Sequence, residues 1–296
     1  MNSNQKRRVV ILGCCGFIGT QLFTVIQNAG FDVWGIDRVV SDNPQIIQAN
    51  LLDPQETKTA FQRIGKCDVI LHLMALSTGT QPPLGETLET VNIKFTQNIL
   101  NAVNDVEQFI YFSTTTVYGE ENRNGFVSPR DELRPASLYG IGKKQCEEMI
   151  IAKNFRATAI CRPTPVYSEN RMRNLQVRAY FPFTKIKIRL IPSPRYSLCN
   201  IQKVLENTLQ VIQENKPGIS IRNFADEQPF FQSEIVKMFS GYSWPFFTYT
   251  FFPFYLLLKL IPGKKSYKLR CLYRKLFASC LYSTEVVEIQ KPQINQ

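Results

Sequence analysis

The chain is poor in the residues that build metal centres. Its 296 residues include a single histidine, His72, and none of its eight cysteines belongs to a Cys-x-x-Cys pair. Zinc sites use such ligands in closely spaced sets, so the sequence predicts no metal site. Cysteines scattered through apolar, strand-like segments are typical of buried free thiols in a reducing compartment, which favours a cytoplasmic protein.

We also expect neither a secretory signal peptide nor a modular organisation. Its polar start, residues 1–8, is followed by too few apolar residues for a signal peptide. There is no internal repeat and no low-complexity linker. A length of 296 residues accommodates two domains, or one large α/β domain with an added lobe.

Acidic residues are scarce in the second half. Residues 151–296 carry 22 Lys and Arg against 8 Asp and Glu, whereas residues 1–150 carry 13 against 16. The basic half therefore favours an anionic neighbour, which could be a phosphorylated substrate, nucleic acid or a lipid surface. Because no RNA-binding signature or zinc-finger spacing accompanies the charge, we expect no nucleic-acid partner.

Short apolar segments alternate with helix-like segments up to Arg162, which predicts a doubly wound parallel Rossmann sheet. Prolines then break this pattern, so we expect a nucleotide-binding domain over 1–165 and a smaller substrate lobe over 166–296, partly interwoven with the sheet. The predicted strands are 9–13, 32–37, 46–50, 69–73, 109–113, 158–162 and 219–224, and the predicted helices are 17–29, 54–64, 88–103, 139–152 and 201–213.

A glycine-rich turn follows the first predicted strand. Gly13, Gly16 and Gly19 allow close approach of the backbone to a pyrophosphate at a helix N-terminus. Asp37 ends the second strand, where an acid can bind the ribose hydroxyls, and it would repel a 2′-phosphate. This favours NAD, although Arg38 follows immediately and keeps NADP as the alternative.

Asp53 has two interpretations. It can meet the adenine edge of the same cofactor, or it can cap the helix that starts at Pro54.

A catalytic set is predicted around the fifth strand. Tyr139 and Lys143 are four residues apart, so they share one helix face, and Thr114 follows the strand. A tyrosine has a pKa of about 10, and we expect the Lys143 ammonium to lower it so that Tyr139 exchanges a proton with a substrate hydroxyl. Thr114 would orient that hydroxyl. The alternative is an ordinary surface helix in which the aliphatic part of the lysine side chain packs over the tyrosine ring.

These motifs, together with 72–75, 91–92, 112–119 and 162–163, resemble the extended short-chain dehydrogenase/reductases of the NAD-dependent epimerase/dehydratase type. The resemblance is specific as a set and covers the chain to about Tyr167. It implies an enzyme that uses NAD. The further residues it implies at the cofactor are Phe17, Ile18, Leu73, Ala75, Asn92, Ser113, Tyr139, Lys143 and Arg162.

A weaker resemblance continues through 174–175, 190–192 and 195–198 and into the late segments 244–261 and 279–287. It is to bacterial surface-polysaccharide members that act on UDP-sugars as 4-epimerases or 4-ketoreductases, and it implies that Asn174 and Arg195 contact the nucleotide diphosphate. Phe95 replaces the usual glycine of the helix after the Val-Asn pair, so we expect it to crowd the cofactor side. We therefore expect a nucleotide-sugar 4-epimerase with tightly held NAD, with a 4-keto-sugar reductase as one alternative and a non-catalytic nucleotide-binding scaffold as another. The family also implies a homodimer through helices 88–103 and 139–152.

One late segment has two interpretations. Residues 244–261 are strongly apolar, and basic residues follow up to 275. The segment 244–275 could lie on an anionic membrane surface, or 244–261 could form a buried helix of the lobe, which we rank slightly higher.

Overall fold

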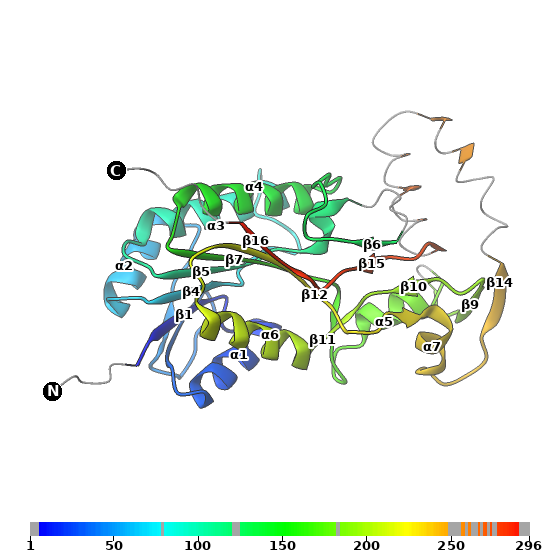
Figure 1. Ribbon diagram of the computed structural model, residues 1–296, viewed down its shortest axis with the longest axis horizontal. Helices are drawn as coiled ribbons and strands as arrows, with labels where there is room; N and C mark the ends of the chain where they lie inside the picture. The colour runs from blue at the N-terminus through cyan, green and yellow to red at the C-terminus, as the bar shows by residue number, and fades with distance from the viewer. Residues whose placement is uncertain are drawn as a thin grey trace.

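The computed structural model describes residues 6–77, 80–119, 125–181, 184–247 and 277–289, and single positions between 256 and 273. An eight-stranded sheet forms its centre (Figure 1). In spatial order its strands are β16 (Val286–Ile289), β12 (Gly218–Phe224), β7 (Ala157–Pro163), β5 (Gln108–Phe112), β4 (Val69–His72), β1 (Arg8–Leu12), β2 (Asp32–Asp37) and β3 (Ile46–Gln48).

The strand order is that of a doubly wound sheet. All neighbours are parallel except β16, which is antiparallel to β12. β1 pairs with β2 on one side and with β4 on the other. The loops after β1 and β4 therefore diverge and open a crevice at the carboxyl ends of the strands, where this fold binds nucleotides. The predicted Rossmann architecture is confirmed.

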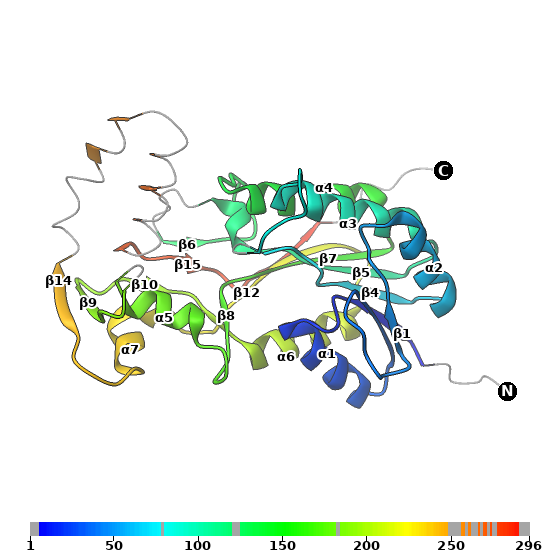
Figure 2. The same ribbon diagram turned by 180° about the vertical axis from the view of Figure 1, so that it is seen from behind.

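Helices cover both faces of the sheet because its strands are apolar on both sides. Val10 and Leu12 of β1 join one buried cluster, while Val9 and Ile11 join the other. Figures 1 and 2 show the two helical layers. The first layer contains α2 (Pro54–Ile64), α3 (Leu88–Ala102) and α4 (Leu138–Lys153), and the second contains α1 (Phe17–Asn28) and α6 (Ile201–Glu214).

A smaller lobe lies beyond the carboxyl ends of the central strands (Figure 1). Its own core includes Leu175, Tyr196, Leu198 and Ile235. The lobe and its junction contain the pairs β8 (Val166–Tyr167) with β11 (Cys199–Asn200), β9 (Ile188–Ile191) with β14 (Trp244–Phe247), β10 (Arg195–Tyr196) with β13 (Phe230–Phe231) and β6 (Phe126–Val127) with β15 (Leu281–Tyr282), the helices α5 (Arg173–Ala179) and α7 (Gln232–Lys237), and the 3-10 turn η1 (Thr115–Tyr118).

The predicted strands and helices up to Phe224 are confirmed, with shifts of one or two residues at their ends. β12 and β16 return from the second half of the chain to the central sheet. The division at residue 165 stays a prediction.

The prediction of a buried helix over 244–261 is wrong for its first four residues. Trp244–Phe247 form strand β14, because their backbone pairs with β9. Residues 248–255 and 258–259 lie outside the described residues, and the described side chains at 256, 257, 260 and 261 are exposed. Among the residues that the structure describes, no helix is long and apolar enough to cross a membrane.

Candidate active site

The glycine turn after β1 is a cradle that larger residues would fill. Gly13 has φ +85°, a left-handed conformation that glycine adopts without strain. A Cβ on Gly19 would lie 2.2 Å from the carbonyl oxygen of Gly13, so only glycine lets α1 start this close to the loop. Gly16 is the N-cap of α1 and has no capping side chain, which leaves backbone N–H groups directed at the crevice.

Asp37 is held beside this cradle by the backbone. One carboxylate oxygen accepts from the N–H of Cys15 at 3.0 Å, and the other accepts from the N–H of Val39 at 3.2 Å. The side chain is buried at the end of β2. A fixed carboxylate at this place can accept hydrogen bonds from a ribose, as the sequence predicts.

A cavity of about 570 Å³ opens between the cradle and the loop after β4. This volume lies in the range of small-molecule sites. Phe95 lines this cavity, which remains open, and its crowding of a bound cofactor stays a prediction. The cavity brings together six of the predicted cofactor residues, Gly13, Gly16, Asp37, Arg38, Leu73 and Ala75.

The structure assigns Asp53 to the second of its two interpretations. Its carboxylate accepts from the N–H groups of Gln55 and Glu56 and caps α2. Asp53 does not line the cavity, whereas the segment 50–52 does. Asp53 therefore caps its own helix, and its contact with the adenine edge stays a prediction.

The predicted catalytic residues come from neighbouring elements. Thr114 caps η1, and its hydroxyl accepts from the N–H of Thr116 at 3.2 Å. Tyr139 and Lys143 lie on α4, whose first turn packs against η1 so closely that a Cβ on Gly140 would be 3.0 Å from the carbonyl oxygen of Thr116. The fold therefore brings all three predicted residues to the carboxyl end of β5, next to the cofactor crevice.

Burial controls the charges of this set. Lys143 is buried, donates to the carbonyl oxygen of Phe112 at 2.6 Å and lies 4.4 Å from the centroid of the Tyr111 ring. Desolvation lowers the pKa of Lys143 to about 8. Desolvation also raises the pKa of Tyr139 to about 12, whereas the sequence predicted a lowered pKa. The difference has a physical reason: burial disfavours the charged phenolate, and the neighbouring Cys146 adds to this effect.

Two further predicted cofactor residues frame the site. The hydroxyl of Ser113 is buried and has no hydrogen-bond partner among the described residues, so it can accept or donate to a bound molecule. The amide of Asn92 instead brackets the backbone of Leu76, accepting from its N–H at 2.7 Å and donating to its carbonyl at 3.1 Å. Asn92 thus fixes the loop that lines the cavity.

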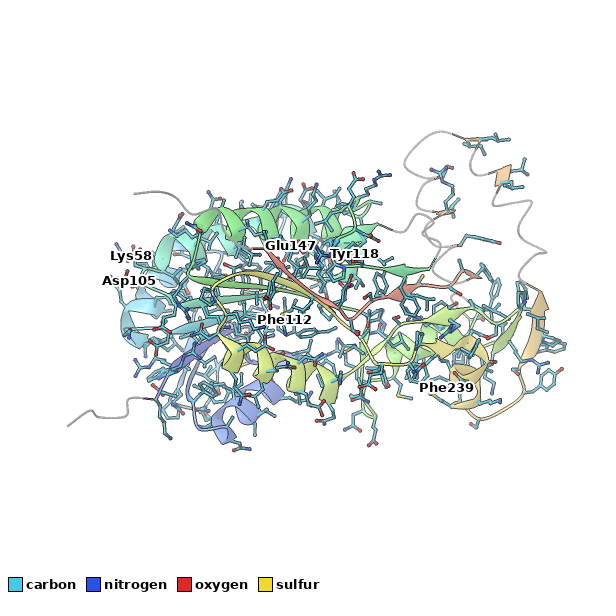
Figure 3. All side chains as sticks on the ribbon, viewed as in Figure 1. Lys58, Asp105, Phe112, Tyr118, Glu147 and Phe239 are labelled. Atoms are coloured by element: carbon cyan, nitrogen blue, oxygen red, sulfur yellow. The ribbon has the colours of Figure 1, made fainter. Side chains whose placement is uncertain are left out.

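The geometry gives Arg162 a structural role. Its guanidinium is buried and donates to both carboxylate oxygens of Glu147, at 3.0 and 2.6 Å, and to the hydroxyl of Tyr118 at 2.8 Å. Figure 3 labels Glu147 and Tyr118 on adjoining elements. These contacts link α4 to β7, so Arg162 holds the helix that carries Tyr139 and Lys143 against the sheet. A cofactor contact for Arg162 stays a prediction that this geometry does not favour.

The two predicted diphosphate contacts lie in the lobe. The side-chain nitrogen of Asn174 donates to the carbonyl of Val166 at 2.6 Å. The guanidinium of Arg195 stacks on Phe231, 5.3 Å from its centroid, and its buried Nε has no partner among the described residues. Sequence reasoning missed Arg171, which lies 4.5 Å from the Phe17 ring centroid and brings a positive charge to the first turn of α1.

Two thiols lie beside Asp37. Ligand atoms of Cys14, Cys15 and Asp37 are within 4.8 Å of one another. Burial, then the neighbouring Cys15 and Asp37, raises the pKa of Cys14, and burial, then Asp37, raises that of Cys15. Since metal ions bind thiolates, these neutral thiols do not favour a metal. The absence of a metal site stays a prediction.

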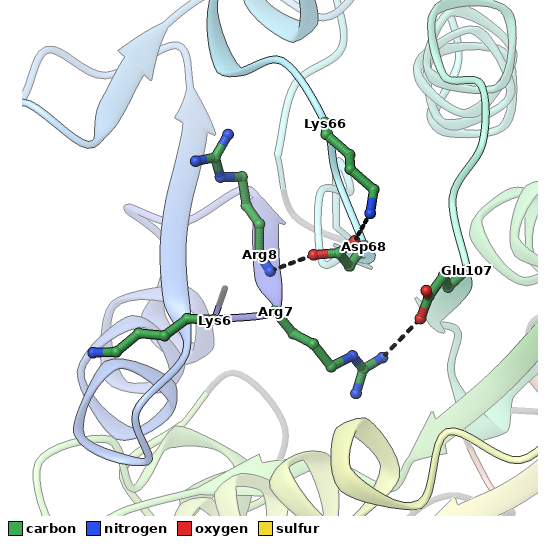
Figure 4. A pocket seen from close by; sticks show the side chains of 6 residues that line it. All are labelled: Lys6, Arg7, Arg8, Lys66, Asp68 and Glu107. Carbon is green, nitrogen blue, oxygen red and sulfur yellow. Dashed lines mark hydrogen bonds and ion pairs between the residues drawn. The ribbon is translucent and has the colours of Figure 1, made fainter. Parts of the chain in front are cut away.

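A second hollow of about 220 Å³ lies at the amino ends of the strands, opposite the crevice (Figure 4). Most of its charges are already paired: Asp68 accepts from the N–H of Arg8 at 2.7 Å and binds Lys66 at 3.0 Å, and Arg7 lies 3.9 Å from Glu107. It joins the amino ends of β1 and β4 and offers no catalytic group.

The fold and the crevice define a Rossmann nucleotide-binding protein with a Tyr–Lys pair at the carboxyl ends of its strands. The chain belongs to the NAD dependent epimerase/dehydratase family, whose family model matches residues 9–185. The resemblance inferred from the motifs is thereby confirmed.

Curated relatives are similar over about half of their length. YtcB of Bacillus subtilis, described as an uncharacterized UDP-glucose epimerase, is 28% identical over 162 residues, 48% of this chain and 50% of its own. The UDP-glucose 4-epimerase uge1 of Schizosaccharomyces pombe is 27% identical over 171 residues, 51% of this chain and 48% of its own.

Solved structures share the fold. WbmG of Bordetella bronchiseptica in complex with NAD has a TM-score of 0.70 at 14% identity, over 96% of this chain and 87% of its own. A UDP-glucuronic acid 4-epimerase of Bacillus cereus in complex with NAD has a TM-score of 0.65 at 21% identity, over 81% and 87%. A dTDP-4-dehydrorhamnose reductase of Bacillus anthracis in complex with NADP has a TM-score of 0.64 at 16% identity, over 83% and 86%.

Proposed function

We propose that the chain is an NAD-dependent nucleotide-sugar epimerase, of the UDP-hexose 4-epimerase type, that makes precursors of cell-surface polysaccharides. This proposal rests mainly on one observation. The glycine cradle and Asp37 lie at the carboxyl ends of the central strands, and so do Thr114, Tyr139 and Lys143. The UDP-glucose epimerase relatives support the substrate class. A cytoplasmic location is part of the proposal.

The residues present fit a dinucleotide. The turn from Gly13 to Gly19 would hold a pyrophosphate, because its glycines leave free the space that a Cβ at Gly19 would fill. Asp37 would hold the adenosine ribose. The buried hydroxyl of Ser113 is available near the reacting end. When bound, NAD supplies a hydride acceptor that later returns the hydride to the sugar. The Asp37 carboxylate favours NAD over NADP.

The protein residues would move the proton. Thr114 orients the C4 hydroxyl of the sugar, and Tyr139 takes its proton as the hydride leaves C4, then returns a proton after the keto-sugar has turned over. Because the pKa of Tyr139 is about 12 in the structure, charge from Lys143 and from the oxidised cofactor must lower it in the complex. The unpartnered Nε of Arg195 supports its proposed contact with the diphosphate, whereas Asn174 would have to release Val166.

Released cofactor is the direct test. We would denature the purified protein, identify the released nucleotide by mass spectrometry and absorbance, and then assay UDP-hexoses. Stoichiometric NAD with sugar interconversion is expected. Tyr139→Phe should abolish turnover and retain NAD; undiminished turnover in this variant would contradict the catalytic assignment.

The second candidate is a 4-keto-sugar reductase that uses exchangeable NADH or NADPH. Arg38 supports it, since this residue lines the cavity directly after Asp37 and could meet a 2′-phosphate. Steady NADH or NADPH consumption with a UDP-4-keto-6-deoxy sugar would favour the reductase. A protein that binds no dinucleotide at all would favour the scaffold.

We also propose a homodimer through α3 and α4. These helices lie side by side on one face of the sheet, and Gly142 permits the approach, since a Cβ there would lie 2.8 Å from the Cα of Glu89. Sedimentation at micromolar concentration tests the assembly. A monomer under these conditions would contradict it.

A further inference from the structure

The far end of the lobe exposes large apolar side chains. Tyr242 and Trp244 are 72% and 61% exposed, and their rings meet edge to face at 5.4 Å. Ile186 is 51% exposed, and Phe181 is also exposed, on the segment that leads into β9. Since β9 pairs with β14, these four residues lie at one end of the molecule (Figure 1). We call Phe181, Ile186, Tyr242 and Trp244 the aromatic edge.

The aromatic edge is held in place by buried contacts. The ammonium of Lys187 is buried and binds three successive carbonyl oxygens, those of Phe239 (2.6 Å), Ser240 (3.2 Å) and Gly241. The N–H of Trp244 in turn donates to the carbonyl of Lys187 at 2.9 Å. Figure 3 shows Phe239 at this end. Tyr242 and Trp244 are therefore exposed on a turn and a strand that hydrogen bonds hold in place.

Charge in these segments has a single sign. Residues 170–205 and 235–284 together contain 16 Lys and Arg and no Asp or Glu. Lys185 and Arg189 are exposed directly beside the aromatic edge. Exposed apolar side chains continue at the described positions 256, 257, 260 and 261. A second copy on this face would bring like charges together, which opposes self-association.

We propose that the aromatic edge docks the protein peripherally on an anionic lipid bilayer. Trp and Tyr favour the interface of a bilayer, where the ring is apolar and its polar atom stays hydrated. Lys185 and Arg189 would face the lipid phosphates, and basic side chains near such a surface are attracted within a Debye length. This inference is independent of the proposed epimerase activity.

Tryptophan fluorescence reports on this edge directly. The chain has two tryptophans, Trp34 and Trp244, so a Trp34→Phe protein leaves Trp244 as the only emitter. Vesicles of phosphatidylglycerol should shift its emission to the blue at low salt, vesicles of phosphatidylcholine should not, and about 0.5 M salt should reverse the shift. No shift with phosphatidylglycerol would overturn the proposal.

Flotation of the full chain with the same vesicles tests the residues. Trp244→Ser with Tyr242→Ser, and separately Lys185→Glu with Arg189→Glu, should each lower the floated fraction at least about fivefold. Lys58→Glu is the matched control, because Lys58 is exposed on α2 at the opposite end (Figure 3). Circular dichroism checks that each variant is folded. Equal flotation of all variants, or a blue shift that depends on protein concentration without vesicles, would overturn the docking.

Discussion

The ion pair beneath the catalytic helix allows a quantitative prediction for Glu147→Ala. The carboxylate of Glu147 and the guanidinium of Arg162 are 2% and 3% exposed and share hydrogen bonds of 3.0 and 2.6 Å. Removing one partner of a buried pair costs about 3–5 kcal/mol, because the other charge stays in apolar surroundings. A domain is stable by only about 5–15 kcal/mol, so this variant should lose a large share of its stability.

Urea unfolding followed by circular dichroism measures the loss. With a slope of about 3 kcal/mol per molar urea, the midpoint should fall by about 1–1.7 M. Glu148→Ala is the matched control: the next residue on α4 forms an exposed pair with Lys144 at 3.6 Å, which contributes less than about 1 kcal/mol. Equal midpoints for the two variants would refute the reasoning.

A second substitution separates charge from packing. Adding Arg162→Met to Glu147→Ala removes the uncompensated charge, so the double variant should recover a measurable part of the lost midpoint. The hydroxyl of Tyr118 keeps its bond to Asn223, at 2.7 Å, in either background. A double variant less stable than Glu147→Ala would mean that packing, and not charge, sets the cost.

Three further predictions concern the site. Gly19→Ala should abolish NADH binding measured by fluorescence, since its Cβ would lie 2.2 Å from a carbonyl oxygen, while Thr24→Ala on the exposed side of α1 should bind normally. Tyr139→Phe should lower turnover by at least about 100-fold with NADH affinity unchanged, as expected for a lost proton donor. The affinity of the cofactor-free protein for NADH should fall as pH rises through about 8, where Lys143 loses its proton. The unfolded chain keeps that proton to about pH 10.5, so the free energy of unfolding should rise with pH between about 8 and 10.5. Lys143→Met should flatten both the binding profile and the stability profile.

The fold was predictable because it follows from local patterns. Apolar strands buried on both sides, such as β1, alternate with amphipathic helices, and this alternation admits few topologies. Gly13 and Gly19 could be interpreted at once, since a turn that approaches a phosphate tolerates no side chain. The sequence left open whether the segment that starts at Trp244 is exposed or buried, because an apolar segment alone does not say whether another part of the chain covers it.

By itself the sequence determined the sheet, the glycine cradle, Asp37 and the Thr–Tyr–Lys set, all of which depend on spacing along one or two neighbouring elements. Only the tertiary structure decided which polar groups are already engaged. It placed Asp53 on its own helix, Arg162 on Glu147 and Lys143 on the Phe112 carbonyl, and it raised the pKa of Tyr139 through burial. Hydrogen-bond partners and desolvation depend on residues distant in the chain, and no local pattern carries that information.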